Sequence, residues 1–186
     1  MEEVTESVIR RAAAGDVDAF EIIYRRYSRF VYNVAFRVVR TREAAEEVVQ
    51  EVFMAVYRKL KDFRFRASLK TWLYRITVNT AVNTARKQSR EQDRMRMYKD
   101  QMTAGEIFPG MEAAADKEYA EKTVRVLLGH LNPDQRACLV LRSIEGLSYQ
   151  EIAETLKINI NTVRSRLKRA RETLLALRKE VSQNEL

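Results

Sequence analysis

The chain has 186 residues with 34 Lys or Arg and 26 Asp or Glu, and its formal net charge of +8 at pH 7 favours an anionic partner, most commonly nucleic acid. Five glycines and two prolines are too few for a turn-rich β-sandwich or barrel, whereas an apolar share of 46% can build helical cores, so we expect an all-α fold. With Cys138 as the only cysteine and His130 as the only histidine, the sequence excludes an internal disulfide and a Cys/His metal cluster, and we expect no cofactor.

Amphipathic helices are predicted throughout the first 90 residues. Apolar residues recur at three-four spacing over residues 16–40, with Asp16 as a plausible N-cap, and again after Thr41. Ser68 can cap a third helix, whose inward face would include Leu69, Trp72, Leu73, Ile76 and Val82. A shorter helix before Gly15 adds a fourth face, so we expect one compact domain over residues 1–90.

The helical pattern dissolves between residues 91 and 116, where charges of both signs, methionines, glycine and proline gather. We interpret this segment as a linker. Periodicity returns past Lys117, and Asn132, Pro133 and Gln135 predict a capped helix that runs to Ile144. Cys138 lies in an apolar run of this helix, and we expect it to be a buried small hydrophobe.

A helix-turn-helix is predicted near the C-terminal end. Ser148 and Glu151 form a capping box for a short helix that ends near Leu156, and Asn161 restarts the chain as a helix to about Lys179. One face of this last helix is apolar and should pack on the preceding helix: Val163, Leu167, Ala170 and Leu174. Before Glu172, the other faces carry five cations: Arg164, Arg166, Lys168, Arg169 and Arg171. An isolated basic face is often merely solvated, but a basic second helix of this motif favours reading of the DNA major groove.

Two further segments carry charge patterns of opposite sign. Residues 63–90 hold seven basic and no acidic residues, interleaved with Phe63, Phe65, Trp72 and Tyr74, a composition that suits single-stranded DNA. A helical Trp is often core, whereas Phe63 and Phe65 precede the helix, so we expect at least one of them to be exposed. The second predicted helix carries acids away from its apolar stripe, as far as Glu51 beside Met54. Such acids complement the helix dipole, or they form a docking surface for a basic partner.

These segments, in this order, resemble the extracytoplasmic-function sigma family of bacterial RNA polymerase. The resemblance is carried by GDVDAFEIIYRRY, AAEEVVQEVF and FRFRASLKTWLYRITVNTAVNTARK in the first half, and by LNPDQRACLVLRSIEGLSYQEIAETLKININTVRSRLKRARETL in the second. It covers most of the chain outside the linker and both tails, and the combination is specific, whereas one helix-turn-helix would not be. The stretch VNTAVN is most similar to the envelope-stress sigma-E branch.

The resemblance implies a region 2 domain of three or four helices over residues 1–90, a flexible linker over residues 91–116 and a helix-turn-helix region 4 domain over residues 117–186. It implies a cytoplasmic, non-enzymatic protein, in keeping with the absence of an apolar run long enough for a membrane span or signal. The implied partners are core RNA polymerase, promoter DNA and an anti-sigma factor. The protein would direct polymerase to minus-35 and minus-10 elements and promote melting of the latter.

The resemblance also assigns residues to each task. Core polymerase would meet Glu43, Glu46, Glu47, Gln50, Glu51 and Met54. The minus-10 element would meet Phe63, Arg64, Phe65, Arg66, Ser68, Lys70, Trp72, Arg75, Asn79, Asn83 and Arg86. The minus-35 duplex would meet Asn161, Thr162, Arg164, Ser165, Lys168 and Arg169.

Two positions depart from the family pattern. Ala44 stands where many members have an aspartate, and Lys157 stands where the turn often has a glycine. If Lys157 adopts a left-handed backbone, the strain costs on the order of 1 kcal/mol. Two other classes of function stay open at this point: an operator-binding regulator, which predicts a dimer on palindromic sites, and an adaptor that binds only proteins.

Overall fold

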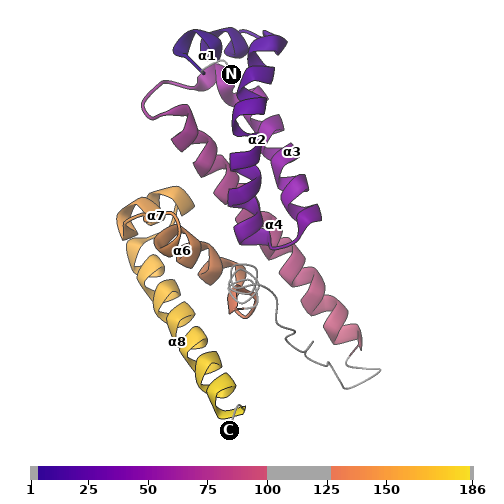
Figure 1. Ribbon diagram of the computed structural model, residues 1–186, viewed down its shortest axis with the longest axis vertical. Helices are drawn as coiled ribbons and strands as arrows, with labels where there is room; N and C mark the ends of the chain where they lie inside the picture. Colours follow the sequence, from indigo (N-terminus) through magenta and orange to yellow (C-terminus); the bar gives the residue numbers. More distant parts are fainter. Residues whose placement is uncertain (1–3, 100–126, 185–186) are drawn as a thin grey trace. The chain divides into compact units, whose positions relative to one another are not determined.

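The computed structural model describes residues 4–99 and 127–184, and the regular structure within these ranges is helical (Figure 1). Contacts within the chain group residues 4–84 and Glu154–Lys157 into one unit and the other described residues into a second. None of the described helices is long and apolar enough to cross a membrane.

The first unit begins with four helices and a short 3-10 turn. They are α1 (Glu6–Ala13), α2 (Val17–Val39), α3 (Arg42–Lys59), the 3-10 helix η1 (Leu60–Asp62) and α4 (Leu69–Lys99). The residues of α4 after Thr84 are grouped with the second unit. Asp16 accepts a hydrogen bond from the Ala19 amide at 3.0 Å, and Ser68 accepts one from the Thr71 amide at 3.1 Å. Thr41 caps α3 in the same way. The predicted helix starts and the predicted short helix before Gly15 are therefore confirmed.

Small and branched apolar side chains form the core of this unit. α2 and α3 pack side by side, with residues such as Val34, Val48 and Val52 removed from solvent. Leu73 of α4 is also fully buried. Trp72 and Ile76, which were expected on the inward face of α4, are only half-buried. Tyr74, Thr77, Val78 and Ala81 are buried instead, so the buried stripe of α4 is shifted around the helix from the one that the apolar pattern predicted.

The second unit carries the helix-turn-helix. Its helices are α6 (Pro133–Ser143), α7 (Tyr149–Leu156) and α8 (Ile160–Asn184), and the end of α7 from Glu154 on is grouped with the first unit. The Asn132 side chain accepts from the Gln135 amide while the Gln135 side chain accepts from the Asn132 amide, which confirms the predicted capping box. Ser148 and Glu151 exchange the equivalent pair of bonds at the start of α7.

The apolar stripe of α8 packs mainly on α6, not on the preceding helix as predicted. Ala170 joins Val140 and Leu128 in a buried cluster against which Leu174 is also packed. The reason is geometric, because the short α7 cannot cover a stripe that continues along a helix of 25 residues. The predicted end of this helix near Lys179 was also too early, since α8 runs to Asn184.

α4 extends into the segment that the sequence predicts as a linker, in which short helical pieces were allowed. α4 continues through Lys99, so the first residues of the predicted segment 91–116 are helical. Residues 100–116, and residues 117–126 of the predicted second domain, lie outside the described residues. The division of the whole chain into 1–90, 91–116 and 117–186 stays a prediction.

Candidate functional site

The start of α8 is built by a tight turn after α7. Lys157 has a φ of 54°, the left-handed conformation considered above, and Asn159 then caps the helix by accepting a hydrogen bond from the Asn161 amide at 2.8 Å. The helix therefore begins at Ile160, one residue earlier than predicted. This turn fixes the direction in which the first two turns of α8 present their side chains.

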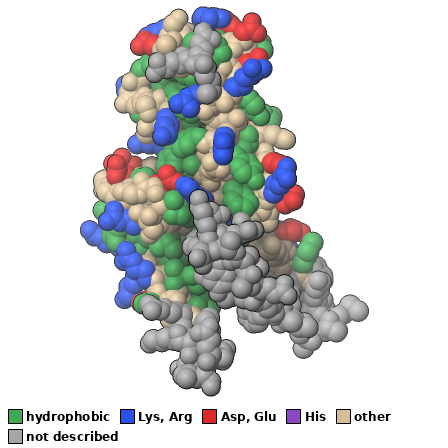
Figure 2. Space-filling model, in the orientation of Figure 1, with side chains coloured by type: hydrophobic (Ala, Val, Ile, Leu, Met, Phe, Trp, Pro, Cys, Tyr) green, Lys and Arg blue, Asp and Glu red, His purple; other side chains and the backbone are tan. Residues whose placement is uncertain are grey.

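Most of the residues predicted to read duplex DNA lie exposed on these first turns. Asn161, Arg164, Ser165, Lys168 and Arg169 are exposed, and Thr162 is half-buried. Figure 2 shows Lys and Arg side chains gathered along α8. The Arg164 guanidinium donates to the Asn161 side-chain oxygen at 2.8 Å, and the Ser165 hydroxyl donates to the Thr162 carbonyl at 3.0 Å. A basic, exposed helix start of this kind has the chemistry that phosphates and guanine edges accept.

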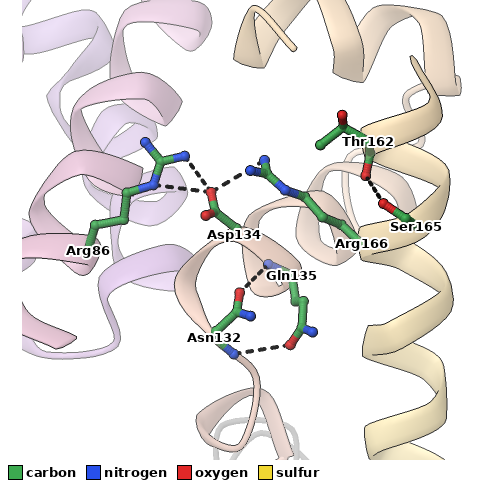
Figure 3. Close-up of polar contacts among 7 residues, drawn as sticks. All are labelled: Arg86, Asn132, Asp134, Gln135, Thr162, Ser165 and Arg166. Carbon is green, nitrogen blue, oxygen red and sulfur yellow. Dashed lines mark hydrogen bonds and ion pairs between the residues drawn. The ribbon is translucent and has the colours of Figure 1, made fainter. Parts of the chain in front are cut away.

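Arg166 does not belong to this exposed set, although the sequence grouped it with the outward cations. Its guanidinium lies 3.3 Å from the Asp134 carboxylate at the start of α6, and its side chain keeps only 20% of its exposure (Figure 3). Arg86, a predicted minus-10 contact, lies in the same unit, and its Nε donates to the same Asp134 oxygen at 3.1 Å. Both guanidinium groups are thus engaged with one carboxylate.

Residues 63–68 form a loop with two close aromatic contacts, which we call the aromatic loop. The Phe63 ring lies 4.8 Å from that of Phe65 and 5.2 Å from that of Trp72, measured between centroids. Phe65 has a φ of 55° and remains 37% exposed, which confirms the expectation that one of the two rings is exposed. The two cations of the loop, Arg64 and Arg66, are exposed, as is Ser68.

The remaining predicted minus-10 residues follow along α4. Arg75, Asn79, Asn83 and Arg86 recur at three-four spacing and so share one face of the helix. Asn83 is exposed, while Asn79 is half-buried and its amide donates to the Arg75 carbonyl at 2.7 Å. The Lys70 ammonium lies 5.2 Å from the centroid of the Phe30 ring. α4 thus continues the cationic, amide-bearing surface that starts at the aromatic loop.

A surface of opposite charge lies on α3, and we call it the acidic face. All six of its predicted residues are exposed: Glu43, Glu46, Glu47, Gln50, Glu51 and Met54. Glu46 accepts a hydrogen bond from Arg42 at 2.8 Å. Met54 is 56% exposed, an unusual position for a large apolar side chain. Acids with an exposed apolar residue beside them suit a protein partner better than nucleic acid.

Sequence reasoning missed several features beside these surfaces. Tyr24 and Tyr57, which were placed on inward apolar stripes, are 44% and 53% exposed on α2 and α3. Tyr can occupy such partly exposed positions because its hydroxyl stays in solvent while its ring packs on other side chains. Here the ring of Tyr24 packs against Phe53, and that of Tyr57 against Phe20. Arg10 of α1 was also missed, because its contact with the aromatic loop depends on how α1 packs and leaves no local signal.

The single cysteine is buried, and the described residues form no cluster of metal-ligating side chains. Cys138 is fully buried, as predicted, and burial raises the pKa of its thiol to about 11, so the thiol stays protonated at neutral pH. Within residues 4–99 and 127–184, no His, Cys, Asp or Glu side chains cluster in a way that could hold a metal ion.

Comparison with protein-family models gives two matches to this chain. Sigma-70 region 2 matches residues 23–91, which include α3, the aromatic loop and most of α4. Sigma-70 region 4 matches residues 121–174, which include α6, α7 and the exposed start of α8. The two matches therefore contain all three charged surfaces.

Curated relatives match nearly the whole chain. The RNA polymerase sigma-H factor of Pseudomonas aeruginosa is 35% identical over 184 residues and covers 93% of each chain. The ECF RNA polymerase sigma-E factor of Haemophilus influenzae is 33% identical over 180 residues, covering 93% of this chain and 95% of the relative. That of Escherichia coli K12 is 33% identical, covering 93% and 94%.

Solved structures give the same fold. CnrH in complex with the cytosolic domain of CnrY has a TM-score of 0.58 at 26% identity, covering 96% of this chain and 99% of that one. The sigma factor RpoE of Bartonella quintana, in complex with the anti-sigma factor NepR, has a TM-score of 0.58 at 26% identity, covering 86% and 96%.

Proposed function

Because this chain belongs to the extracytoplasmic-function sigma factors, which give RNA polymerase its promoter specificity, we propose a division of tasks among its three charged surfaces. The acidic face binds core RNA polymerase, the start of α8 reads the minus-35 duplex, and the aromatic loop with α4 holds the opened minus-10 strand. The observation that carries this proposal is the separation of charge: exposed acids on α3 against exposed cations on α8 and the aromatic loop.

The acidic face cannot serve DNA, because it would repel phosphates. Glu43, Glu47 and Glu51 follow one another at four-residue spacing and form one row, and the exposed Met54 lies one turn beyond Gln50 in the neighbouring row. A basic surface on polymerase would meet the carboxylates and an apolar contact would cover Met54. Ala44, where many members carry an aspartate, is buried under this face, so a carboxylate there would not reach the partner in this structure.

The aromatic loop suits a flipped base. Phe65 offers an exposed ring on which a base can stack, and Arg64 and Arg66 can neutralise the adjoining phosphates. Removing a base from the stack costs a few kcal/mol, and stacking of about 1 to 3 kcal/mol per base on an aromatic ring can offset it. Asn83 and Asn79 lie farther along α4, where their amides can hydrogen-bond to the next bases.

The start of α8 suits duplex DNA. Arg164, Lys168 and Arg169 are exposed within the first turns of the helix, the part that enters the major groove. Arg164 is fixed by its bond to Asn161, and a fixed guanidinium can make a bidentate contact to guanine at low entropic cost. Arg166 is not part of this surface, because it joins α8 to α6 through Asp134.

In this account the chain performs no chemistry of its own, and polymerase makes the transcript. It acts in the cytoplasm, where core polymerase and promoters are found. An anti-sigma factor is a further proposed partner. This partner is supported by the family resemblance and by the likeness to RpoE, which was solved with an anti-sigma factor.

Run-off transcription tests the proposed function. Purified core RNA polymerase from the organism that encodes the chain is incubated with a library of promoter fragments, with and without the full-length protein. We expect transcripts to start at a subset of promoters that share spaced minus-35 and minus-10 elements, and only when the protein is present. Binding of the protein alone to palindromic sites, with no effect on transcripts, would instead identify an operator-binding regulator.

A further inference from the structure

The N-terminal helix α1 carries a cation that contacts the aromatic loop. Arg10 lies in the last turn of α1, and the central carbon of its guanidinium is 4.8 Å from the centroid of the Phe65 ring. A guanidinium within about 6 Å of a ring centroid is attracted to the ring. Figure 1 shows α1 lying across the end of the first unit at which the chain leaves η1 toward α4.

Glu6 holds Arg10 in this position. The Nε atom of Arg10 donates to a Glu6 carboxylate oxygen at 2.8 Å, one turn back along α1. Both side chains are more than half exposed, so the pair adds little to the stability of the fold. Its effect is on geometry, because it limits the rotamers of Arg10 to those that place the guanidinium over the Phe65 ring.

Contacts that hold the Phe65 ring in place matter because the backbone of this residue is strained. Its φ of 55° is a left-handed conformation that costs an L residue on the order of 1 kcal/mol, and strained residues of this kind gather at functional sites. The ring contacts both the Arg10 guanidinium and the Phe63 ring, yet 37% of the residue remains exposed. Only that exposed part can receive a base.

We propose that Arg10 is a positioning residue of the aromatic loop, which stacks on Phe65 and holds its ring ready to receive a base of the opened minus-10 strand. This inference rests on the function proposed for the loop. Arg10 acts through Phe65 and not by contacting DNA itself. The role of α1 is then to brace the loop that captures the base.

A double-mutant cycle tests this coupling. Full-length Arg10→Ala, Phe65→Ala and the double variant are each bound to core polymerase, and the rate of promoter opening is followed by the fluorescence of 2-aminopurine placed in the minus-10 element. We expect Arg10→Ala to slow opening about two- to fivefold, as loss of an exposed cation–π contact implies. The double variant should open as slowly as Phe65→Ala alone, and Arg10→Lys should recover part of the rate.

Arg25→Ala is the matched control. Arg25 forms the same kind of exposed pair, with Glu21 one turn back on α2, and should open promoters at the wild-type rate. Two results would contradict the positioning role of Arg10 and leave the proposed function of the aromatic loop intact. In the first, the reductions in opening rate caused by Arg10→Ala and Phe65→Ala multiply in the double variant. In the second, Arg10→Ala opens promoters at the wild-type rate while Phe65→Ala opens them slowly. If Phe65→Ala itself opens promoters at the wild-type rate, both the positioning role of Arg10 and the proposed function of the aromatic loop are wrong.

Discussion

The guanidinium of Arg166 on α8 lies 3.3 Å from the carboxylate of Asp134 on α6. This pair removes one cation of α8 from the exposed surface that we propose to read DNA. Arg164, two residues earlier, is exposed and donates to the neighbouring Asn161. Two arginines of one helical turn therefore differ: Arg166 holds α8 on α6, whereas Arg164 is exposed and available for the proposed recognition of DNA.

Alanine substitutions should separate these two tasks. In the complex with core polymerase, Arg164→Ala should lose about 1 to 3 kcal/mol of discrimination at one minus-35 position, as expected for a bidentate guanine contact. Arg166→Ala should lower the free energy of unfolding by about 1 to 2 kcal/mol, because it leaves Asp134 with one cation fewer in a half-buried site. Competition binding and urea denaturation measure the two effects, and equal losses of stability in both variants would contradict the assignment.

The aromatic loop should act after the first encounter with the promoter. If the aromatic loop holds the opened strand as proposed, Phe65→Ala and Arg66→Ala remove a stacking surface and a phosphate contact that a closed duplex does not use. We therefore expect both variants to form unopened complexes at nearly the wild-type level but to yield several-fold fewer opened ones. Permanganate reactivity of unpaired thymines, compared with total promoter occupancy, measures the difference. A parallel decrease in both quantities would assign the loop to initial binding instead.

Lys157 is a strained position in the turn before α8. Its φ of 54° is one that glycine adopts without penalty, so Lys157→Gly should raise the free energy of unfolding by about 1 kcal/mol. Lys157→Ala, which keeps the Cβ atom, serves as the control for loss of the charged side chain and should not stabilise the protein. Thermal unfolding of the three proteins measures this. The Lys157→Gly variant should have a higher melting temperature than both the wild type and the Lys157→Ala variant.

Acid should weaken the start of α2. The Ala19 amide and the Arg11 guanidinium hold the pKa of Asp16 below its ordinary value of 3.8. Because the folded-state pKa is the lower one, this stabilisation is fully present above pH 3.8 and is lost as the pH falls through the folded-state value. Asp16→Asn keeps a capping acceptor that does not titrate, so its unfolding free energy should fall less steeply in this window. The free energy of unfolding of both proteins is measured as a function of pH. Parallel curves would show that Asp16 contributes nothing to the pH dependence of stability.

The helices were predictable from the sequence because their signals are local. Thr41 and Ser68 each precede a periodic apolar run, and the Asn132–Gln135 box lies within four consecutive residues. The exposed acids of α3 and cations of α8 follow from helical spacing once the apolar stripe is known. The exposure of all six acidic-face residues could be predicted for this reason.

What could not be predicted depends on contacts between distant segments. Arg166 looks like its neighbours until α6 brings Asp134 beside it, and nothing near Arg10 in the sequence indicates that Phe65 will lie over its guanidinium. Tyr24 and Tyr57 fit the apolar period of their helices, yet they lie beyond the edge of the packed core. Helical spacing predicts on which face of a helix a residue lies. Whether that residue is buried depends on how far the neighbouring helix covers this face.

The affinity of the full-length chain for core RNA polymerase at modest salt is the most direct test of the proposed division of tasks. The wild-type protein should bind core polymerase. A variant with Glu47→Lys and Glu51→Lys should bind at least about tenfold more weakly, a loss of about 1.4 kcal/mol in binding free energy. Glu21→Lys on α2 is the control and should bind like the wild type. Failure of the wild-type chain to bind core polymerase, or equal binding by the variant with a reversed acidic face, would contradict it.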